Sequence, residues 1–480
     1  MSKRPNIVLI MCDQWRGDCL SALGHPVVET PYLDKMTTEG ITFTNAYSTT
    51  PTCIAARAAL FTGLKPRNHG RVGYKDGVEW NYPVTLAGEF TKNGYQTQAI
   101  GKMHVYPERS QLGFQNVILH DGYLHFARNQ HRDHGQIDDY LPWLKQHMGY
   151  DADYLDHGVD CNANVARPWD KPEYTHPSTW VVTESIDFLR RRDPRKPFML
   201  FMSFHRPHQP YDPPQAYWDQ YIDREMPDPP LGDWEQFFDE YEDSWNPNTL
   251  VGELSPNRLQ RARAGYFGNM SHIDTQLQRF FEVLREYGEY DNTWFIFTAD
   301  HGELLGDHHL FRKALPYEGS ACIPMIIKPP SHREVAKRVK VDTPVCLRDV
   351  MPTLLDAADL PIPDSLDGQS MLEIVAGEQK EPRPLLQGEH TVFGQSIMYV
   401  TNGHQKYVWF SKTGDEQFFD LDTDPQELQE VSSNLQYAEQ LESFRDFLIH
   451  ELDGREEGFT DGKKLIPGRP VNPVLSFLRE

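Results

Sequence analysis

Cys53 occupies a position where a thiol could act as a nucleophile or be modified. Residues 51–63 read Pro-Thr-Cys-Ile-Ala-Ala-Arg-Ala-Ala-Leu-Phe-Thr-Gly; the alanines, arginine and leucine favour a helix, and Gly63 is a natural end. Cys53 would open that helix, where backbone amides and the helix dipole attract an anion, and Arg57 adds positive charge one turn later. A lone cysteine more often packs in a core, and an unmodified thiol nucleophile is the second interpretation.

Polar side chains follow four short apolar runs that read as buried strands, at residues 6–11, 98–101, 197–204 and 293–298. They are Asp13 and Gln14 after the first, Lys102 and His104 after the second, His205 and His208 after the third, and Asp300 and His301 after the fourth. In open α/β sheets ligands bind outside the carboxyl ends of the strands, so these four groups are expected to meet in one crevice.

Four of these residues form a plausible shell for a divalent cation. Asp13, Gln14, Asp300 and His301 supply two carboxylates, an amide oxygen and an imidazole. An isolated aspartate after a strand is more often a helix N-cap, and an isolated histidine is more often structural. Their pairing favours the metal site, and Gly302 would allow close approach of the backbone.

The strands alternate with helical stretches, which predicts an α/β fold whose sheet is covered on both faces. A fifth strand is expected at 324–328 and helices at 31–39, 85–93, 183–191 and 261–287. Two stretches, 121–170 and 207–233, read as long insertions near the site. The pattern then changes: antiparallel strands at 396–401, 406–410 and 417–421 and a helix at 437–452 predict a small C-terminal α+β subdomain. We therefore divide the chain into a catalytic domain, 1–371, and a subdomain, 372–480.

Composition excludes several classes of protein. The net charge of −23 disfavours a nucleic-acid partner, and no stretch approaches the roughly 18 apolar residues of a membrane span. Six cysteines in 480 residues, without a C-x-x-C pair, resemble neither a disulfide framework nor a zinc site. The apolar run at 6–11 is too short for a signal peptide, so we expect a soluble, cytoplasmic protein.

Several motifs together resemble the sulfatase family. Cys53-Ile-Ala-Ala-Arg57 with Leu60-Phe-Thr-Gly63 is similar to its signature, C-x-[PA]-x-R followed by T-G. Further matches, in order, are Asp13-Gln14, Thr30-Pro-x-Leu-Asp34, Gly101-Lys-Met-His104, Pro207-His-Gln-Pro210, Asp300-His-Gly-Glu-x-x-Gly-Asp-His308, Lys313, Tyr317-Glu318 and Phe419-Asp-Leu-x-x-Asp-Pro425. The resemblance implies the alkaline phosphatase-like fold, a mixed sheet between helices. Two departures are Gln14, where many members have a second aspartate, and Ala55, where proline is commoner.

The resemblance also implies a mechanism. A maturation enzyme converts Cys53 to formylglycine, whose hydrated form attacks the sulfur of a sulfate ester with help from Asp300. The metal ligands would be Asp13, Gln14, Cys53, Asp300 and His301; calcium is the expected ion and manganese the alternative. Arg57, Lys102 and Lys313 would face the sulfuryl oxygens, His104 would be the base that releases sulfate, and His208 the acid for the leaving oxygen.

Alternatives differ in substrate and in class. Phosphonate monoester and phosphodiester hydrolases share the Asp-Gln start but lack Lys102 and His104 after the second strand; an unmodified glycan-binding pseudoenzyme would lack turnover. The expected substrate is a sulfated saccharide or an aryl sulfate, and a homo-oligomer is possible. Candidate specificity residues in the insertions and loops are Tyr106, Tyr123, His125, Arg128, His134 and Trp169.

Overall fold

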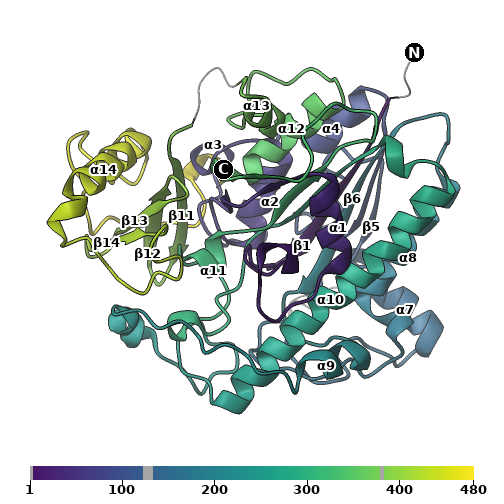
Figure 1. Cartoon of the computed structure of the whole chain (residues 1–480), viewed down its shortest axis with the longest axis horizontal. Coiled ribbons are helices and arrows are strands. Elements are labelled where there is room, and N and C mark those ends of the chain that lie inside the picture. The colour runs from purple at the N-terminus through teal and green to yellow at the C-terminus, as the bar shows by residue number, and fades with distance from the viewer. Residues whose placement is uncertain (1–3, 123–132, 379–382, 480) are drawn as a thin grey trace.

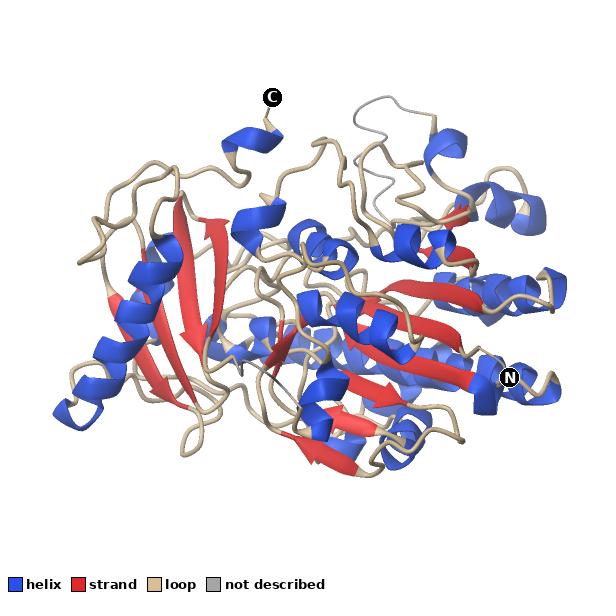
Figure 2. Cartoon of the chain, turned by 90° about the horizontal axis from the view of Figure 1, so that it is seen from above, coloured by secondary structure: helices blue, strands red, loops and turns tan. Residues whose placement is uncertain are grey.

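Two β-sheets organise the chain, whose computed structural model describes residues 4–122, 133–378 and 383–479. Figure 2 shows the sheets as two separate groups of strands. Within the described residues, the larger sheet has eight strands in the order β5-β4-β6-β1-β7-β8-β2-β9. Their bounds are β1 (Asn6–Asp13), β2 (Ile41–Phe43), β4 (Gln96–Gly101), β5 (Asn116–Leu119), β6 (Phe198–Pro207), β7 (Thr293–Ala299), β8 (Met325–Lys328) and β9 (Val339–Val341).

The four central strands are parallel, and this determines where the site lies. β4 pairs with β6, β6 with β1 and β1 with β7, all in parallel, whereas β8 runs antiparallel to β7. Every residue of β1, β6 and β7 is buried, which explains why their sequences are continuous apolar runs rather than alternating ones. The carboxyl ends of four neighbouring strands therefore share one edge.

Helices cover both faces of this sheet (Figure 1). α8 and α10 pack on one face, and α2, α4 and α12 lie on the other. The α-helices are α1 (Pro31–Glu39), α2 (Cys53–Thr62), α3 (Pro66–His69), α4 (Leu86–Lys92), α6 (His134–Ile137), α7 (Tyr140–Met148), α8 (Pro177–Arg191), α9 (Gln215–Tyr221), α10 (Pro256–Glu286), α11 (Glu318–Ala321), α12 (Val350–Ala357), α13 (Met371–Ala376) and α14 (Ala438–Leu452). The expected fold class, a mixed sheet between helices, is confirmed.

Helix starts were the weakest expectation. α10 begins five residues before the expected 261, because Pro256 fits the first turn of a helix, where its missing amide hydrogen costs nothing. α8 begins at Pro177 rather than 183, and the His176 imidazole accepts the Ser178 amide there. The stretch 121–170 contains α7, whose buried Tyr140, Leu141 and Leu144 form one helical face that was not expected from the sequence.

The C-terminal sheet is antiparallel, in the order β11-β12-β13-β14. Its strands are β11 (Leu386–Val392), β12 (Gln395–Thr401), β13 (Gln405–Phe410) and β14 (Glu416–Asp420); β11 was not expected from the sequence. β3 (Ala46–Tyr47) and β10 (Val345–Cys346) form a separate, two-stranded sheet.

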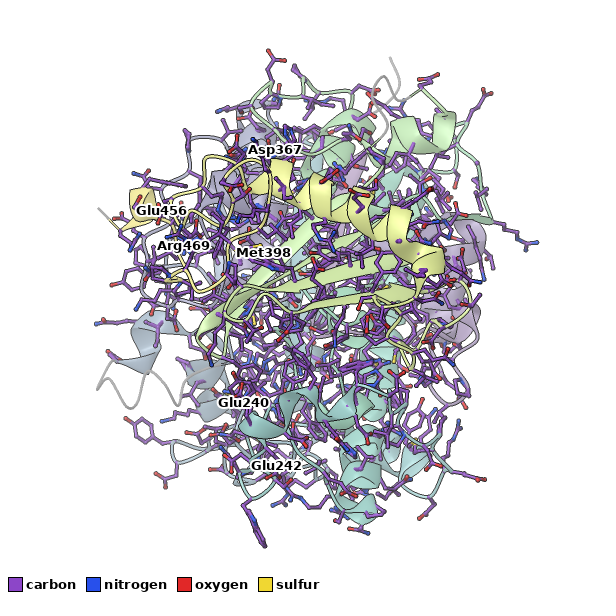
Figure 3. All side chains as sticks on the ribbon, turned by 90° about the vertical axis from the view of Figure 1, so that its left-hand side faces the viewer. Glu240, Glu242, Asp367, Met398, Glu456 and Arg469 are labelled. Carbon is purple, nitrogen blue, oxygen red and sulfur yellow. The ribbon has the colours of Figure 1, made fainter. Side chains whose placement is uncertain are left out.

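The two faces of the C-terminal sheet have different neighbours. Met398, labelled in Figure 3, lies on the face that α14 covers, together with Leu441 and Phe444. Ile397 and Tyr399 lie in the cluster that joins the other face to the main body, and the Tyr399 hydroxyl donates to the Ser48 carbonyl at 2.8 Å. The sheet is therefore packed against the segment that leads into α2. The boundary at 371/372 stays a prediction.

Two expectations about the whole chain can be compared with the structure. None of the six cysteines is in a disulfide, as the sequence indicated. In the part of the chain that the structure describes, no helix has the length and apolar character needed to cross a bilayer.

Candidate active site

The polar groups expected at four strand ends do meet. Asp13 ends β1 and forms an ion pair with Lys102, which follows β4. Asp300 follows β7, and its Oδ1 accepts the Gln14 amide at 3.1 Å. His208 follows β6, and its backbone amide donates to the Asp13 carbonyl at 3.1 Å. These contacts join strands far apart in sequence at one edge of the sheet, so the crevice predicted from strand ends exists.

A set of cation-binding atoms lies at the centre of this edge. One ligand atom each from Asp13, Cys53, Asp300 and His301 lies within 4.8 Å of the others, and all four residues are buried. His301 Nε2 is 3.3 Å from Asp13 Oδ1 and 3.6 Å from Asp300 Oδ1. Ligand atoms around one calcium ion lie at most about 5 Å apart, since each metal–oxygen distance is about 2.4 Å. The donor set therefore fits a single divalent cation.

Backbone packing holds the Asp300 loop tightly. The His301 Nδ1 is 2.9 Å from the Gly302 carbonyl, which leaves Nε2 directed at the cluster. A Cβ on Gly302 would lie 2.1 Å from the Gly319 carbonyl oxygen, so no side chain fits there. The glycine thus has the role that the sequence suggested: it lets two loops approach closely behind the ligands.

Gln14 presents its amide oxygen to the same region. Lys313 Nζ donates to Gln14 Oε1 at 3.0 Å, and Gln14 Nε2 donates to Gln209 Oε1 at 2.8 Å and to Glu303. Gln14 is completely buried, with its backbone at a positive φ of 69°. Its oxygen and nitrogen therefore face different partners.

Cys53 opens α2, as predicted, and lies beside the cluster. Its Sγ is 3.4 Å from His301 Nε2, 3.5 Å from Lys313 Nζ and 3.8 Å from Asp13 Oδ1. Burial and the Asp13 carboxylate raise the pKa of the thiol, but Lys102, Lys313 and a hydrogen bond with His104 outweigh them and hold that pKa well below its ordinary value. The surroundings of position 53 thus stabilise negative charge.

Basic residues anchor both central carboxylates. Arg57 Nε donates to Asp300 Oδ2 at 3.0 Å, while Arg57 Nη1 donates to the Lys102 carbonyl at 2.7 Å and to Ser203 Oγ at 2.9 Å. Burial alone would raise the pKa of Asp13, but Lys102 and His208 hold it well below its ordinary value. Lys102 and Arg57 therefore orient the two carboxylates, whereas burial and the Asp13 carboxylate raise the pKa of Asp300 above its ordinary value.

His208 and Lys313 form a pair. Lys313 Nζ lies 2.6 Å from His208 Nε2, and His208 Nδ1 lies 3.0 Å from the Gln209 carbonyl. The carbonyl can only accept, so Nδ1 carries the hydrogen and Nε2 accepts from the ammonium. Burial and the neighbouring Lys313 lower the pKa of His208 well below its ordinary value. The hydrogen between Nζ and Nε2 therefore belongs to Lys313, and the His208 imidazole accepts it.

His104 is placed by its backbone. The Asp121 carboxylate accepts the backbone amides of Met103 at 2.8 Å and His104 at 2.9 Å. A Cβ on Gly101 would lie 1.9 Å from the Ser203 carbonyl oxygen, and the residue has a φ of 97°. These two features turn the chain sharply after β4, so that Lys102 and His104 both reach the site.

Two buried residues near the site were not among the sequence-predicted ones. Glu303 receives hydrogen bonds from Gln14 and Tyr211, and only its place in the Asp300 motif could have indicated it. His390, on β11, is 4% exposed, and neither of its ring nitrogens has a hydrogen-bond partner among the described residues. Burial, with smaller contributions from the charges on His301 and Lys313, lowers the pKa of His390 to about 3. His390 pairs with Ile397 on the sheet face that meets the main body.

The candidate specificity residues are only partly covered by the structure. Tyr123, His125 and Arg128 lie outside the described residues, and α6 contains His134. Trp169 is 5% exposed, and its Nε1 donates to Thr175 Oγ1 at 3.3 Å, which is a packing role. Tyr106 is 37% exposed.

Comparison with known proteins gives a consistent result. Residues 5–360 match the family model described as Sulfatase, and residues 306–453 match the one described as N-sulphoglucosamine sulphohydrolase, C-terminal. An arylsulfatase of Clostridium perfringens is 51% identical over 98% of this chain and 99% of its own. A choline-sulfatase of Rhizobium meliloti is 28% identical over 90% of this chain and 83% of its own.

A solved structure shows the same architecture. The phosphonate monoester hydrolase of Agrobacterium radiobacter superposes with a TM-score of 0.77 at 26% identity, over 93% of this chain and 95% of that chain. The arylsulfatase relative is thus about twice as similar in sequence as this hydrolase.

Proposed function

Because the chain belongs to the sulfatase family and is a sulfuric ester hydrolase, we propose that it cleaves its esters through a formylglycine made from Cys53. The observation that carries this proposal is the position of Cys53. Cys53 is the first residue of α2, and its Sγ lies within 3.5 Å of both His301 Nε2 and Lys313 Nζ. Two buried carboxylates lie beside it. A residue whose only role was packing would not be surrounded by ionisable groups.

A divalent cation at Asp13, Gln14, Asp300 and His301 would act as a Lewis acid on the sulfuryl oxygens and on the nucleophile. Calcium is our choice, because three of these ligands offer oxygen; the imidazole of His301 leaves manganese as the alternative. The oxidised, hydrated Cys53 side chain supplies two hydroxyls, one to take the sulfuryl group and one to release it as sulfate. A maturation enzyme must supply the oxidant.

The remaining catalytic roles are assigned to side chains around Cys53. Lys102 and Arg57 fix the carboxylates of Asp13 and Asp300, so that charge developing on the sulfuryl oxygens meets a preorganised site. His208 Nε2 takes a proton from Lys313 Nζ and passes it to the leaving oxygen as the S–O bond breaks, which leaves Lys313 as a neutral amine. His104 takes the proton of the second hydroxyl when sulfate departs; its contact with Cys53 supports that role.

We propose the substrate at the level of its chemical class. Similarity to an arylsulfatase supports turnover of aryl sulfates, and a small sulfated saccharide is the natural substrate that we propose. None of the six cysteines is in a disulfide, which fits the reducing, cytoplasmic compartment that we propose. We keep a homo-oligomer as a further expectation.

Two measurements test this function together. Mass spectrometry of the tryptic peptide containing Cys53, from protein coexpressed with a maturation enzyme, should find the aldehyde. The same preparation should hydrolyse an aryl sulfate with a higher kcat/KM than phenyl phosphonate, whereas the reverse ratio would establish the phosphonate hydrolase alternative. An unmodified Cys53 together with no turnover of either ester would favour the pseudoenzyme.

A further inference from the structure

We propose that Glu303 is a positioning residue that fixes the side-chain amide of Gln14, so that the amide oxygen faces the cation site. The inference deepens the proposed function and rests on it, because it assigns Gln14 as an oxygen ligand. It concerns a carboxylate that does not itself belong to the cluster of Asp13, Cys53, Asp300 and His301.

A glutamine amide has two ends of nearly equal size, and only its hydrogen bonds decide which end points where. If the Gln14 amide were turned over, its NH2 group would face Lys313 and the cation, and its oxygen would face Glu303. Both contacts would then be repulsive. The neighbours of the NH2 end therefore decide whether position 14 can bind a cation.

Toward the residues that the structure describes, Glu303 acts only as a hydrogen-bond acceptor. Its Oε2 receives Gln14 Nε2, the Tyr211 hydroxyl at 3.0 Å and Gln209 Nε2 at 3.3 Å. Its Oε1 receives the Leu305 amide at 2.9 Å and the Arg312 amide. Five donors converge on one fully buried carboxyl group, which is the pattern of a carboxylate that can only accept. The atom of Gln14 that faces it must be the nitrogen.

The surrounding network leaves Gln14 no second arrangement. Gln209 Oε1 accepts from Gln14 Nε2 at 2.8 Å, while Gln209 Nε2 donates to the Tyr211 hydroxyl at 2.8 Å and to Asn164 Oδ1 at 3.3 Å. Burial and the neighbouring Glu303 raise the pKa of Tyr211 well above its ordinary value, so its hydroxyl stays a donor. Both described partners of the Gln14 NH2 group, Gln209 Oε1 and Glu303 Oε2, are thus acceptors.

The same pairing explains the departure at position 14. Many family members have two adjacent aspartates here. A carboxylate at position 14 of this chain would lie against the Glu303 carboxylate, and in a buried site water would not screen their repulsion. Gln14 avoids that repulsion and still offers an oxygen. Negative charge is kept at Glu303, one side chain further from the cation.

The test is a charge-swap cycle with the variants Gln14→Glu, Glu303→Gln and their combination, all close in size to the native residues. Thermal unfolding in EDTA measures the pairing without any cation. Gln14→Glu should lower the midpoint by about 3–5 °C, because two carboxylates then meet in a buried site. The combined variant should recover most of that loss, because the amide introduced at position 303 can donate to the carboxylate introduced at position 14. Equal losses from Gln14→Glu in both backgrounds would overturn the pairing.

Calcium titration by calorimetry then tests the consequence. Glu303→Gln should weaken calcium binding about 10- to 100-fold, the usual effect of losing a partner behind a metal ligand. The matched control is Glu289→Gln: Glu289 is also buried and accepts the side-chain amide of Asn6 at 2.9 Å, but at the start of β1 and β7 rather than at their ends. The control should change calcium affinity less than about twofold.

The outcomes separate the two proposals. Unchanged calcium affinity in Glu303→Gln, beside a wild type that binds calcium, would overturn the positioning role and leave the cation site intact. A wild type that binds neither calcium nor manganese would overturn the cation site, and the positioning role with it, even if the unfolding cycle showed coupling.

Discussion

Replacing His208 by alanine should slow the cleavage of poor leaving groups far more than that of good ones. His208 Nε2 accepts a hydrogen bond from Lys313 Nζ at 2.6 Å, and the Gln209 carbonyl fixes the tautomer. A positioned general acid contributes about 10²- to 10⁴-fold, or about 3–5 kcal/mol of transition-state stabilisation. A sugar alkoxide needs that proton, whereas nitrophenolate leaves as a stable anion. We expect the full loss with a sulfated saccharide and a much smaller one with nitrophenyl sulfate.

The assay is kcat/KM for a series of aryl sulfates of graded leaving-group acidity, with one sulfated saccharide at the end of the series. The native enzyme should depend weakly on leaving-group acidity, and the variant steeply. The protein should still fold, because Lys313 keeps its hydrogen bond to Gln14 Oε1 at 3.0 Å after the imidazole is removed. His205→Ala is a suitable control, since it removes a second buried imidazole, whose ring centroid is 5.0 Å from that of His208.

An equal loss across the whole series would refute the acid role. His208 would then bind or position the sulfuryl group, and Lys313 would be the next candidate for the acid. If kcat/KM of His205→Ala also depended steeply on leaving-group acidity, the change would come from general loosening of the site rather than from loss of the proton donor.

Three further predictions concern single residues. Cys53→Ala should abolish sulfate ester turnover with an unchanged circular dichroism spectrum, because formylglycine cannot form; retained turnover would contradict the central proposal. Asp300→Ala should lose both bound divalent cation, by elemental analysis, and activity, and a stoichiometric cation in this variant would count against the ligand set. Burial raises the pKa of Asp274 to about 7, although its carboxyl group accepts the backbone amides of Tyr32 and Leu33. The folded state therefore holds this proton more tightly than the unfolded state does. As a result, the free energy of unfolding should fall by about 4 kcal/mol as pH rises from about 4 to about 7. Asp274→Asn should lack that decline, and urea unfolding curves of native and variant protein that shift in parallel between about pH 5 and pH 8 would disprove it.

Sequence was sufficient for the parts of the site that depend on local pattern. A continuous apolar run followed by a polar residue identifies a buried parallel strand and its carboxyl end, and β1, β6 and β7 follow that rule, whereas β4 begins with the polar residues Gln-Thr-Gln. The start of α2 at Cys53 also follows from local propensity, with Gly63 at a φ of 67° ending the helix. The roles of the individual side chains remain proposals.

Three strands of the C-terminal sheet, β12, β13 and β14, were predicted from the sequence, but β11 was not. β11 reads Leu-Gln-Gly-Glu-His-Thr-Val, which lacks the apolar alternation of a half-buried strand. Its Glu389 is buried in an ion pair with Arg455 at 2.7 Å, and Gly388 lies where a Cβ would be 2.2 Å from the Tyr399 ring. Such polar burial is decided by a tertiary partner 66 residues away, which no local window contains.

The arrangement of charges suggests why the site needs so many basic residues. Asp13 gives its Oδ2 to Lys102 and turns Oδ1 toward His301, while Asp300 gives its Oδ2 to Arg57 and turns Oδ1 toward the same imidazole. Each carboxylate thus uses one oxygen for an ion pair with a basic side chain from another structural element and directs its other oxygen toward the cluster. Two buried carboxylates this close would otherwise share a proton and lose affinity for a divalent ion. We therefore expect Lys102 and Arg57 to support cation binding in addition to the sulfate recognition proposed for them, and replacing either should weaken both.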